Sequence, residues 1–99
     1  MIVEWADEAL DDVERLYSFL AAVDFEAAAK VAERLEAAPN KLISFPRIGA
    51  RLEGFNPREV RRLIVGNYEL RYEIFGEVIY VVKVFHTRED RSFEEAYPP

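Results

Sequence analysis

Residues 60–85, VRRLIVGNYELRYEIFGEVIYVVKVF, decide the fold of this 99-residue chain. Apolar and polar side chains alternate there with a period of two, which predicts β-strands rather than helices. Gly66 and Gly76 each open a two-residue interruption, and glycine favours the primed turns that join antiparallel strands. We therefore expect a three-stranded antiparallel meander. Its strands are expected at 60–65, 68–75 and 78–85.

The middle strand alternates most clearly. Its two sets of side chains are Tyr68, Leu70, Tyr72 and Ile74 on one face and Glu69, Arg71 and Glu73 on the other. The first set predicts a core face. The second predicts either a charged catalytic or docking surface, or a solvated face whose charges pair across strands for roughly 0.2–1 kcal/mol per pair. The last strand is apolar on both faces apart from Lys83, so we expect it to be central and covered on both sides.

The first half of the chain has helical spacing. A short strand is expected at 2–5, and apolar residues then recur every three or four positions, with Asp7 as the expected N-cap. Asp24 is expected to cap a second helix, which Pro39 kinks or restarts. Two helices with so short a link fold back as an antiparallel hairpin. The order predicts one α+β domain over residues 1–99, with the helical hairpin packed on one sheet face.

The composition excludes several classes of site. With no cysteine and a single histidine, His86, the chain can form no disulfide, thiolate zinc site, cysteine nucleophile or histidine-based metal cluster. No apolar run reaches the roughly 18 residues that span a bilayer, and acids stand where a secretory signal carries lysines. We expect a cytoplasmic protein without metal, cofactor or membrane partner.

The net charge of −6 is unevenly distributed. Residues 1–38 hold ten acids and three bases, a net −7, whereas residues 39–99 hold nine acids and ten bases, a net +1. This asymmetry suggests that the two halves face different partners. A solvated acidic helix face produces the same pattern.

The one histidine lies at the end of the last strand, in the segment HTREDR at 86–91. A histidine near arginines and acids can act as a general acid or base. No serine or cysteine stands beside His86 as a nucleophile, and a lone histidine at a strand end is more often structural. Gly49 and Gly54 lack the spacing of a phosphate-binding glycine loop.

Four short motifs follow one another along the chain in a fixed order. They are A-x-x-A-L-x-D-V at 6–13, L-x-x-F-P-x-x-G at 42–49, R-x-L-x-V-x-x-Y-x-L-x-Y at 61–72 and V-x-x-V-F-H-T-R-E-D-R at 81–91. In order and spacing, and with Trp5 in the opening strand, they resemble the RelE/ParE toxins of bacterial type II toxin–antitoxin systems. The resemblance covers about residues 1–93 and implies the RelE/ParE-like sandwich.

The RelE-like branch of that family implies ribosome-dependent cleavage of mRNA. Such cleavage needs clustered cations on the sheet, with a C-terminal tyrosine or histidine that helps proton transfer. The resemblance implies a basic residue where this chain has Glu69, and a tyrosine where it has Phe93 and Glu94; Tyr97 lies too far along the chain. Arg88 does match the basic position after the last strand. The nuclease candidates are Arg61, Arg62, Arg71, Lys83 and Arg88.

The ParE-like branch implies inhibitors that bind DNA gyrase and trap it on cleaved DNA without catalysis. The H-x-R-x-D-R segment at 86–91 is closer to this branch, and the absent nuclease positions agree with it. We interpret the chain as a ParE-like inhibitor rather than an enzyme, with a ribosome-dependent nuclease and a non-toxic binding module as the alternatives. The target-binding candidates are His86, Arg88, Arg91, Arg61, Arg62 and Arg71.

The resemblance also implies a cognate ParD-like antitoxin in a hetero-oligomer with the toxin. Its C-terminal segment would wrap the toxin, docking a helix and sometimes a strand. Aromatic residues are numerous for so small a core, so we expect some to line the partner groove; the alternative is that all are core. The antitoxin-binding candidates are Trp5, Tyr17, Phe25, Phe45 and Phe55.

Overall fold

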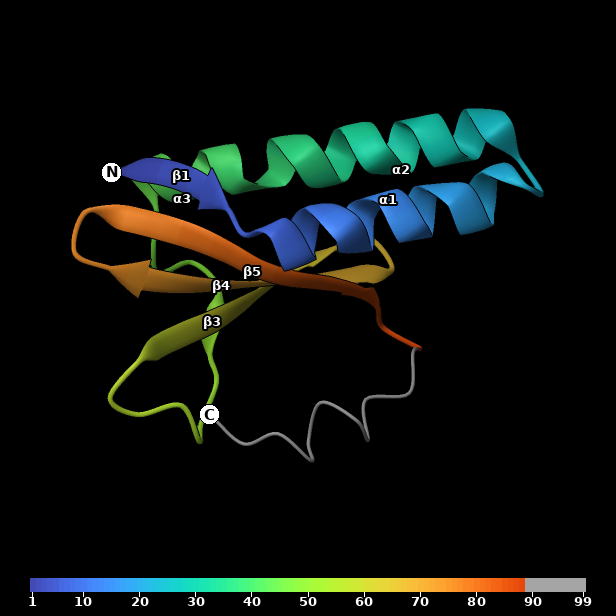
Figure 1. Ribbon diagram of the computed structural model, residues 1–99. Coiled ribbons are helices and arrows are strands. Elements are labelled where there is room, and N and C mark those ends of the chain that lie inside the picture. Colours follow the sequence, from blue (N-terminus) through green and yellow to red (C-terminus); the bar gives the residue numbers. More distant parts are fainter. Residues whose placement is uncertain (89–99) are drawn as a thin grey trace.

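The computed structural model describes residues 1–88, in which a helical layer covers one face of a sheet (Figure 1). The elements are β1 (Ile2–Trp5), α1 (Asp7–Ala21), α2 (Phe25–Ala37), a 3-10 turn η1 (Ala38–Asn40), α3 (Lys41–Ser44), β2 (Ala50–Arg51), β3 (Glu59–Val65), β4 (Tyr68–Phe75) and β5 (Val78–His86). The helices α1 and α2 lie side by side as an antiparallel hairpin, with α1 against β5. The predicted α+β class, helical hairpin and meander are confirmed.

The sheet has five strands in the order β1-β5-β4-β3-β2, two more than the predicted meander. β1 pairs with β5 in parallel, and the two-residue strand β2 pairs antiparallel with Arg61 and Arg62 of β3. β5 is therefore an interior strand, flanked by β1 and β4, as its apolar sequence predicted. β4 takes the middle position, with β5 and β1 on one side and β3 and β2 on the other.

The core lies between the helical hairpin and the sheet. Its buried members come from α1, α2, α3 and the central strands, namely Ala9, Val13, Leu16, Leu35, Leu42, Leu63, Leu70, Tyr72, Ile74, Ile79, Val81 and Val84. The predicted core face of β4 is confirmed, with Tyr68 half-buried at its start. On the opposite face, Glu69 is only 1% exposed, so this part of the sheet is not the solvated surface that alternation alone allowed.

The helix ends follow local chemistry with one exception. Asp24 caps α2 as predicted, because its carboxylate accepts a hydrogen bond of 3.1 Å from the backbone N–H of Ala27. Asp7 is not the cap of α1. Ala6 occupies that position, and Asp7 is the first helical residue, where its charge still favours the positive helix end. Pro39 falls in η1, between α2 and α3, as expected of a residue without a helical donor.

A buried tyrosine fastens the loop after α3 to the sheet. The Tyr72 hydroxyl donates to the carbonyl of Pro46 at 2.8 Å and accepts from the backbone N–H of Gly49 at 3.0 Å. A Cβ at Gly49 would lie 2.4 Å from the carbonyl oxygen of Arg62, so no other residue fits there. Arg61 adds a hydrogen bond of 2.7 Å to the Gly49 carbonyl. The backbone groups of the proline and the glycine in the L-x-x-F-P-x-x-G motif therefore both form hydrogen bonds with the Tyr72 hydroxyl.

Replacing Tyr72 with phenylalanine should lower the free energy of unfolding by about 1–3 kcal/mol, because the buried Gly49 N–H loses its acceptor. Urea unfolding at neutral pH measures the change. The matched control is Tyr80→Phe, at a half-buried tyrosine of β5, which should change stability by less than about 0.5 kcal/mol. Equal effects of the two substitutions would contradict the role given to Tyr72.

Candidate functional site

A β-bulge positions the end of β5 against α1. The pairing of β4 with β5 shifts between Arg71, which faces Lys83, and Tyr72, which faces Val81. Beyond the bulge, the Val84 N–H donates to the carboxylate of Asp12 on α1 at 2.9 Å. A bulge locally disrupts the ladder and bends the strand, so the helix supplies an acceptor at this irregular stretch. The strand end that carries the predicted site is thereby anchored to the helical layer.

Asp12 is a buried acid, with 7% of its surface exposed. Burial raises the pKa of its carboxyl above the ordinary value, and the hydrogen bond from Val84 and the charge of Lys83 oppose that rise. Lys83 lies 3.8 Å from Asp12 and 3.0 Å from Glu8, both on α1. Lys83 is thus directed at the helix.

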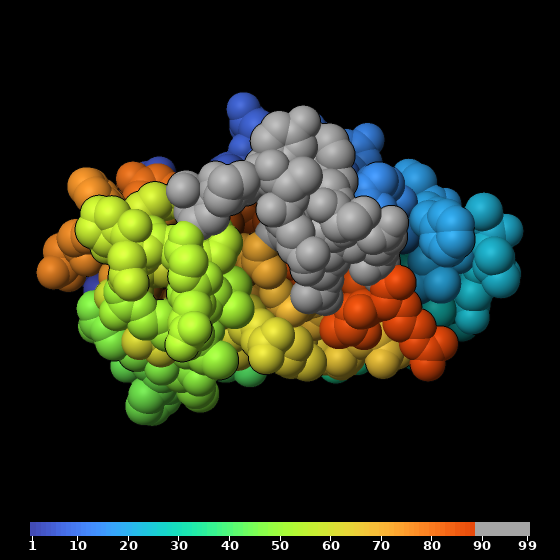
Figure 2. Space-filling view, turned by 90° about the horizontal axis from the view of Figure 1, so that it is seen from below, coloured from blue at the N-terminus to red at the C-terminus, as the bar shows by residue number. Residues whose placement is uncertain are grey.

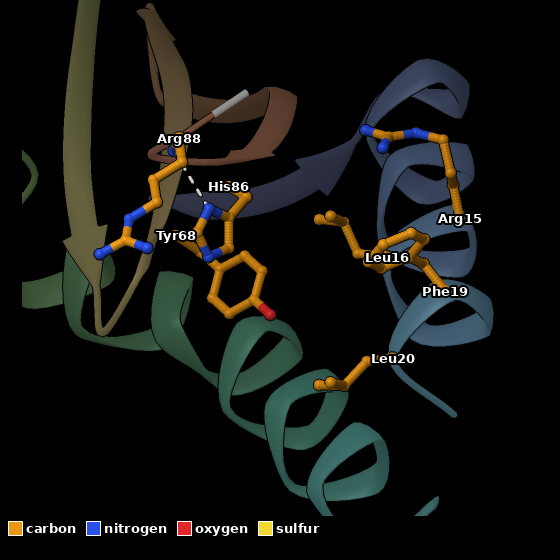
Figure 3. Close-up of a pocket in the computed structure, with 7 residues that line it drawn as sticks. All are labelled: Arg15, Leu16, Phe19, Leu20, Tyr68, His86 and Arg88. Atoms are coloured by element: carbon orange, nitrogen blue, oxygen red, sulfur yellow. Dashed lines mark hydrogen bonds between the residues drawn. The ribbon is translucent and has the colours of Figure 1, made fainter. Parts of the chain in front are cut away.

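The end of β5 borders an open cavity of about 520 Å³, with β4 and β5 on one side and α1 on the other (Figure 3). Tyr68, His86 and Arg88 line the strand side, and Arg15, Leu16, Phe19 and Leu20 line the helix side. We call these seven residues the strand-end site. It combines an apolar wall with hydrogen-bonding and cationic groups, a composition suited to holding part of another protein.

Tyr68 and Arg88 help to fix the orientation of His86. The rings of His86 and Tyr68 meet edge to face, with centroids 5.2 Å apart. The backbone N–H of Arg88 donates to Nδ1 of His86 at 3.0 Å, drawn as a dashed line in Figure 3. Because Nδ1 accepts this bond, the neutral imidazole carries its proton on Nε2.

Two of the other predicted arginines surround Glu69. Arg71 lies 3.0 Å and Arg62 3.8 Å from its carboxylate oxygens. The guanidinium of Arg71 also lies over the rings of Phe85, at 5.2 Å, and of Phe55, at 5.8 Å. A buried carboxylate needs cationic partners of this kind. Arg71 in particular therefore makes a structural contact with Glu69 and with the two aromatic rings.

Arg61 belongs to a second ion-pair group, at the start of β3. Its guanidinium is 2.8 Å from Glu59, which Arg47 also contacts at 2.9 Å. The hydrogen bond from Arg47, followed by that from Arg61, lowers the pKa of the Glu59 carboxyl. The cations predicted for a nuclease are thus distributed among separate groups. Viewed from the side away from the helices, segment 46–58 lies at the left of the molecule and the end of β5 lies right of its centre (Figure 2).

The structure therefore brings His86 and Arg88 together, but not Arg61, Arg62 or Arg71 with them. Arg91 lies outside the described residues. Tyr68, Arg15, Leu16, Phe19 and Leu20 were missed by sequence reasoning. One signal was available: Phe19 falls outside the apolar stripe of its helix, and the structure leaves it 78% exposed.

Among the five aromatic candidates for antitoxin binding, Trp5 packs against the core, but Phe25 and Phe45 are largely exposed, so the alternative that every one is core was wrong. Trp5 and Tyr17 line a depression of about 680 Å³ between α1 and α2, with Leu10, Val13, Glu14, Ala32 and Glu36; we call it the hairpin groove. Phe25 stacks edge-on against Tyr17, with ring centroids 6.3 Å apart. Phe45 is exposed after α3, and Phe55 lies near Arg58 and Arg71. These side chains do not form one surface.

Within residues 1–88, no helix has the length and apolar character required to cross a bilayer. The same residues contain no group of three or more histidine, cysteine, aspartate or glutamate side chains placed to hold a metal ion.

The chain is similar to known toxins in sequence and in structure. The sequence model of the family described as the ParE toxin of type II toxin–antitoxin system, parDE, matches residues 3–91. No curated protein matches the chain.

Solved structures share the architecture, among them these three. The chromosomal ParDE toxin–antitoxin system from P. aeruginosa aligns with a TM-score of 0.68 at 17% identity, covering 87% of this chain and 95% of that one. The isolated E. coli RelE toxin aligns at 0.60 with 22% identity over 96% and 93% of the two chains. The E. coli RelBE toxin–antitoxin complex aligns at 0.60 with 21% identity over 89% and 98%. At these identities the likeness establishes the fold.

Asp12→Asn should change how stability depends on pH. Because the folded-state pKa of Asp12 lies above its ordinary value of 3.8, the stability linked to its protonation is fully present below pH 3.8. That contribution is lost as the pH rises through the folded-state pKa. The unfolding free energy of the wild type minus that of the variant should therefore fall as the pH rises from about 3 to about 7.

Urea unfolding of both proteins across this range provides the measurement. Asp11→Asn removes the same charge from the exposed side of α1 and corrects for the general effect of net charge. A difference between wild type and Asp12→Asn that rises with pH after this correction would contradict the environment assigned to Asp12.

Proposed function

Because the chain belongs to the ParE toxin family of type II toxin–antitoxin systems, we propose that it inhibits DNA gyrase by binding it, and that a ParD-like antitoxin neutralises it. The proposal treats the protein as an inhibitor that performs no catalysis. It acts in the cytoplasm, where its target and its antitoxin are made.

The pairing of the sheet cations carries this proposal. Cleavage of a phosphodiester needs cations that are available to phosphate as charge develops in the transition state. Arg61, Arg71 and Lys83 each lie within 3.0 Å of a carboxylate oxygen. Glu69 in addition places a carboxylate at the position where the RelE-like branch implies a basic residue. This arrangement supports an inhibitor over a nuclease.

The strand-end site supports binding to a protein target. Arg88 is exposed and has no ion-pair partner within residues 1–88, and it adjoins the imidazole of His86, across the cavity from the exposed ring of Phe19. Arginine beside an aromatic ring is a composition enriched where protein surfaces bind each other. We assign His86 and Arg88 to target contact.

A ribosome-dependent nuclease is the second candidate, and one observation favours it. His86 and Arg88 place an imidazole that carries its proton on Nε2 beside a cation, the minimum for proton transfer next to a phosphate. The E. coli RelE toxin, which shares the fold, represents this branch. The third candidate, a non-toxic binding module, predicts unchanged growth when the protein is produced alone.

An antitoxin partner is supported by the solved neighbours. The P. aeruginosa ParDE system and the E. coli RelBE structure are both toxin–antitoxin systems with this toxin fold. We extend that arrangement to this chain and expect a hetero-oligomer with its cognate antitoxin.

In a supercoiling assay, the purified protein should inhibit gyrase and cause cleaved DNA to accumulate. Arg88→Ala should raise the half-inhibitory concentration about tenfold, because it removes the cation at the centre of the proposed contact. The control is Arg51→Ala, at an exposed cation on the edge strand β2, which should leave inhibition unchanged. A folded wild-type protein without effect on gyrase would contradict the proposed function.

A further inference from the structure

Three adjoining depressions surround the turn at Gly66. The cavity of the strand-end site shares Leu20, Tyr68 and His86 with a neighbour of about 320 Å³. That neighbour shares Arg34, Val65 and Gly66 with a third depression of about 540 Å³, which reaches Lys41. Together they form one groove, which we call the cationic groove. Its defining residues are Arg88, His86, Leu20, Arg34, Val65 and Lys41.

The lining of the cationic groove contains positive charge and no carboxylate within residues 1–88. Arg15, Arg34, Lys41 and Arg88 line it, in a chain whose net charge is −6. Arg15 is paired with Asp12 at 3.7 Å, whereas Arg34, Lys41 and Arg88 have no carboxylate within ion-pair distance in that part of the chain. Clustered charges of one sign in a concave surface focus the electrostatic potential and attract a ligand of opposite charge.

Arg34 is held in place at the middle of the groove. Its guanidinium lies against the turn at Gly66, where a Cβ would come within 3.4 Å of Nη2. Gly66 has a φ of +61°, a conformation that glycine adopts without strain. Because Gly66 has no side chain, the guanidinium of Arg34 can lie over this turn at the end of the sheet.

The floor of the groove is apolar. Leu20, Val31 and Val65 line its middle, and Ile64, which is 54% exposed, lies at the end near Lys41. Exposed apolar surface next to concentrated charge is typical of a binding groove for an amphipathic segment. The matching segment presents apolar side chains to this floor and carboxylates to Arg34, Lys41 and Arg88.

The other large depression has the opposite charge. The hairpin groove is lined by Glu14 and Glu36 and contains no lysine or arginine within the described residues. An acidic segment would be repelled there and attracted to the cationic groove. Charge therefore selects between two grooves of similar apolar character.

We propose that the cationic groove is the docking site for an acidic amphipathic segment of the antitoxin. This inference rests on the proposed function, because it takes for granted that an antitoxin exists. A segment seated there covers His86 and Arg88 at one end of the groove, so it blocks the proposed target contact while its main electrostatic contacts are with Arg34 and Lys41.

The test compares charge reversals inside and outside the groove. Arg34→Glu with Lys41→Glu should weaken binding of the antitoxin encoded with this toxin by about 100-fold, because two attractive contacts become repulsive. Lys30→Glu with Arg51→Glu makes the same change in net charge at exposed positions outside the groove and should change binding less than about threefold. Arg34→Gln with Lys41→Gln, a milder variant, should weaken binding and reduce its dependence on salt.

Titration calorimetry with full-length antitoxin at two salt concentrations measures binding, and the gyrase assay is run on the same variants. Loss of antitoxin binding with gyrase inhibition intact supports the inference. Equal binding by the groove variants and the control overturns it while the proposed function stands, and directs attention to the hairpin groove or to pairing between toxin copies. A wild-type protein that binds no antitoxin overturns the proposed function itself.

Discussion

A carboxylate buried on the middle strand of the sheet, near the Gly66 turn, pairs with the nearest arginines of this protein. Glu69 is 1% exposed, and an ionised carboxylate in such a place is tolerated only with cationic partners. Arg71 and Arg62 supply them, at 3.0 and 3.8 Å. Glu69 thus pairs with the nearest cations, the largely buried Arg71 and the more exposed Arg62. A sheet face arranged in this way presents little free positive charge to a phosphate backbone.

The remaining charges follow the layers of the fold. Glu59 binds Arg47 and Arg61 near the loop that Tyr72 fastens, and Lys83 reaches the acids of α1. The cations of the cationic groove lie instead at the opposite end, where α1, α2 and the Gly66 turn meet. The fold thus presents two grooves of opposite sign, and the cationic groove draws its charges from both halves of the sequence, Arg15 and Arg34 from the first and Lys41 and Arg88 from the second.

Much of this architecture follows from local sequence pattern. The alternation along 68–75 gives the bounds of β4 that the structure has, and Asp24 and Pro39 act as their chemistry predicts. The two-residue strand β2 is too short for any periodicity to reveal. Alternation also assigns Glu69 to a face without indicating whether that face is covered. The parallel pairing of β1 with β5 joins distant segments, so the central place of β4 could not be inferred.

The functional site was predictable only in part, because it too joins segments that are distant in the sequence. His86 and Arg88 are close in sequence and were found together, because a strand end keeps neighbours near each other. Leu20 and Arg34 join them from two helices, which no spacing in the sequence encodes.

Cleavage of mRNA on programmed ribosomes tests the central claim, that the cations of the sheet are paired, most directly. A sheet whose cations are paired predicts intact mRNA at stoichiometric amounts of folded protein, whereas cleavage that Arg62→Ala or Arg71→Ala abolishes would contradict it.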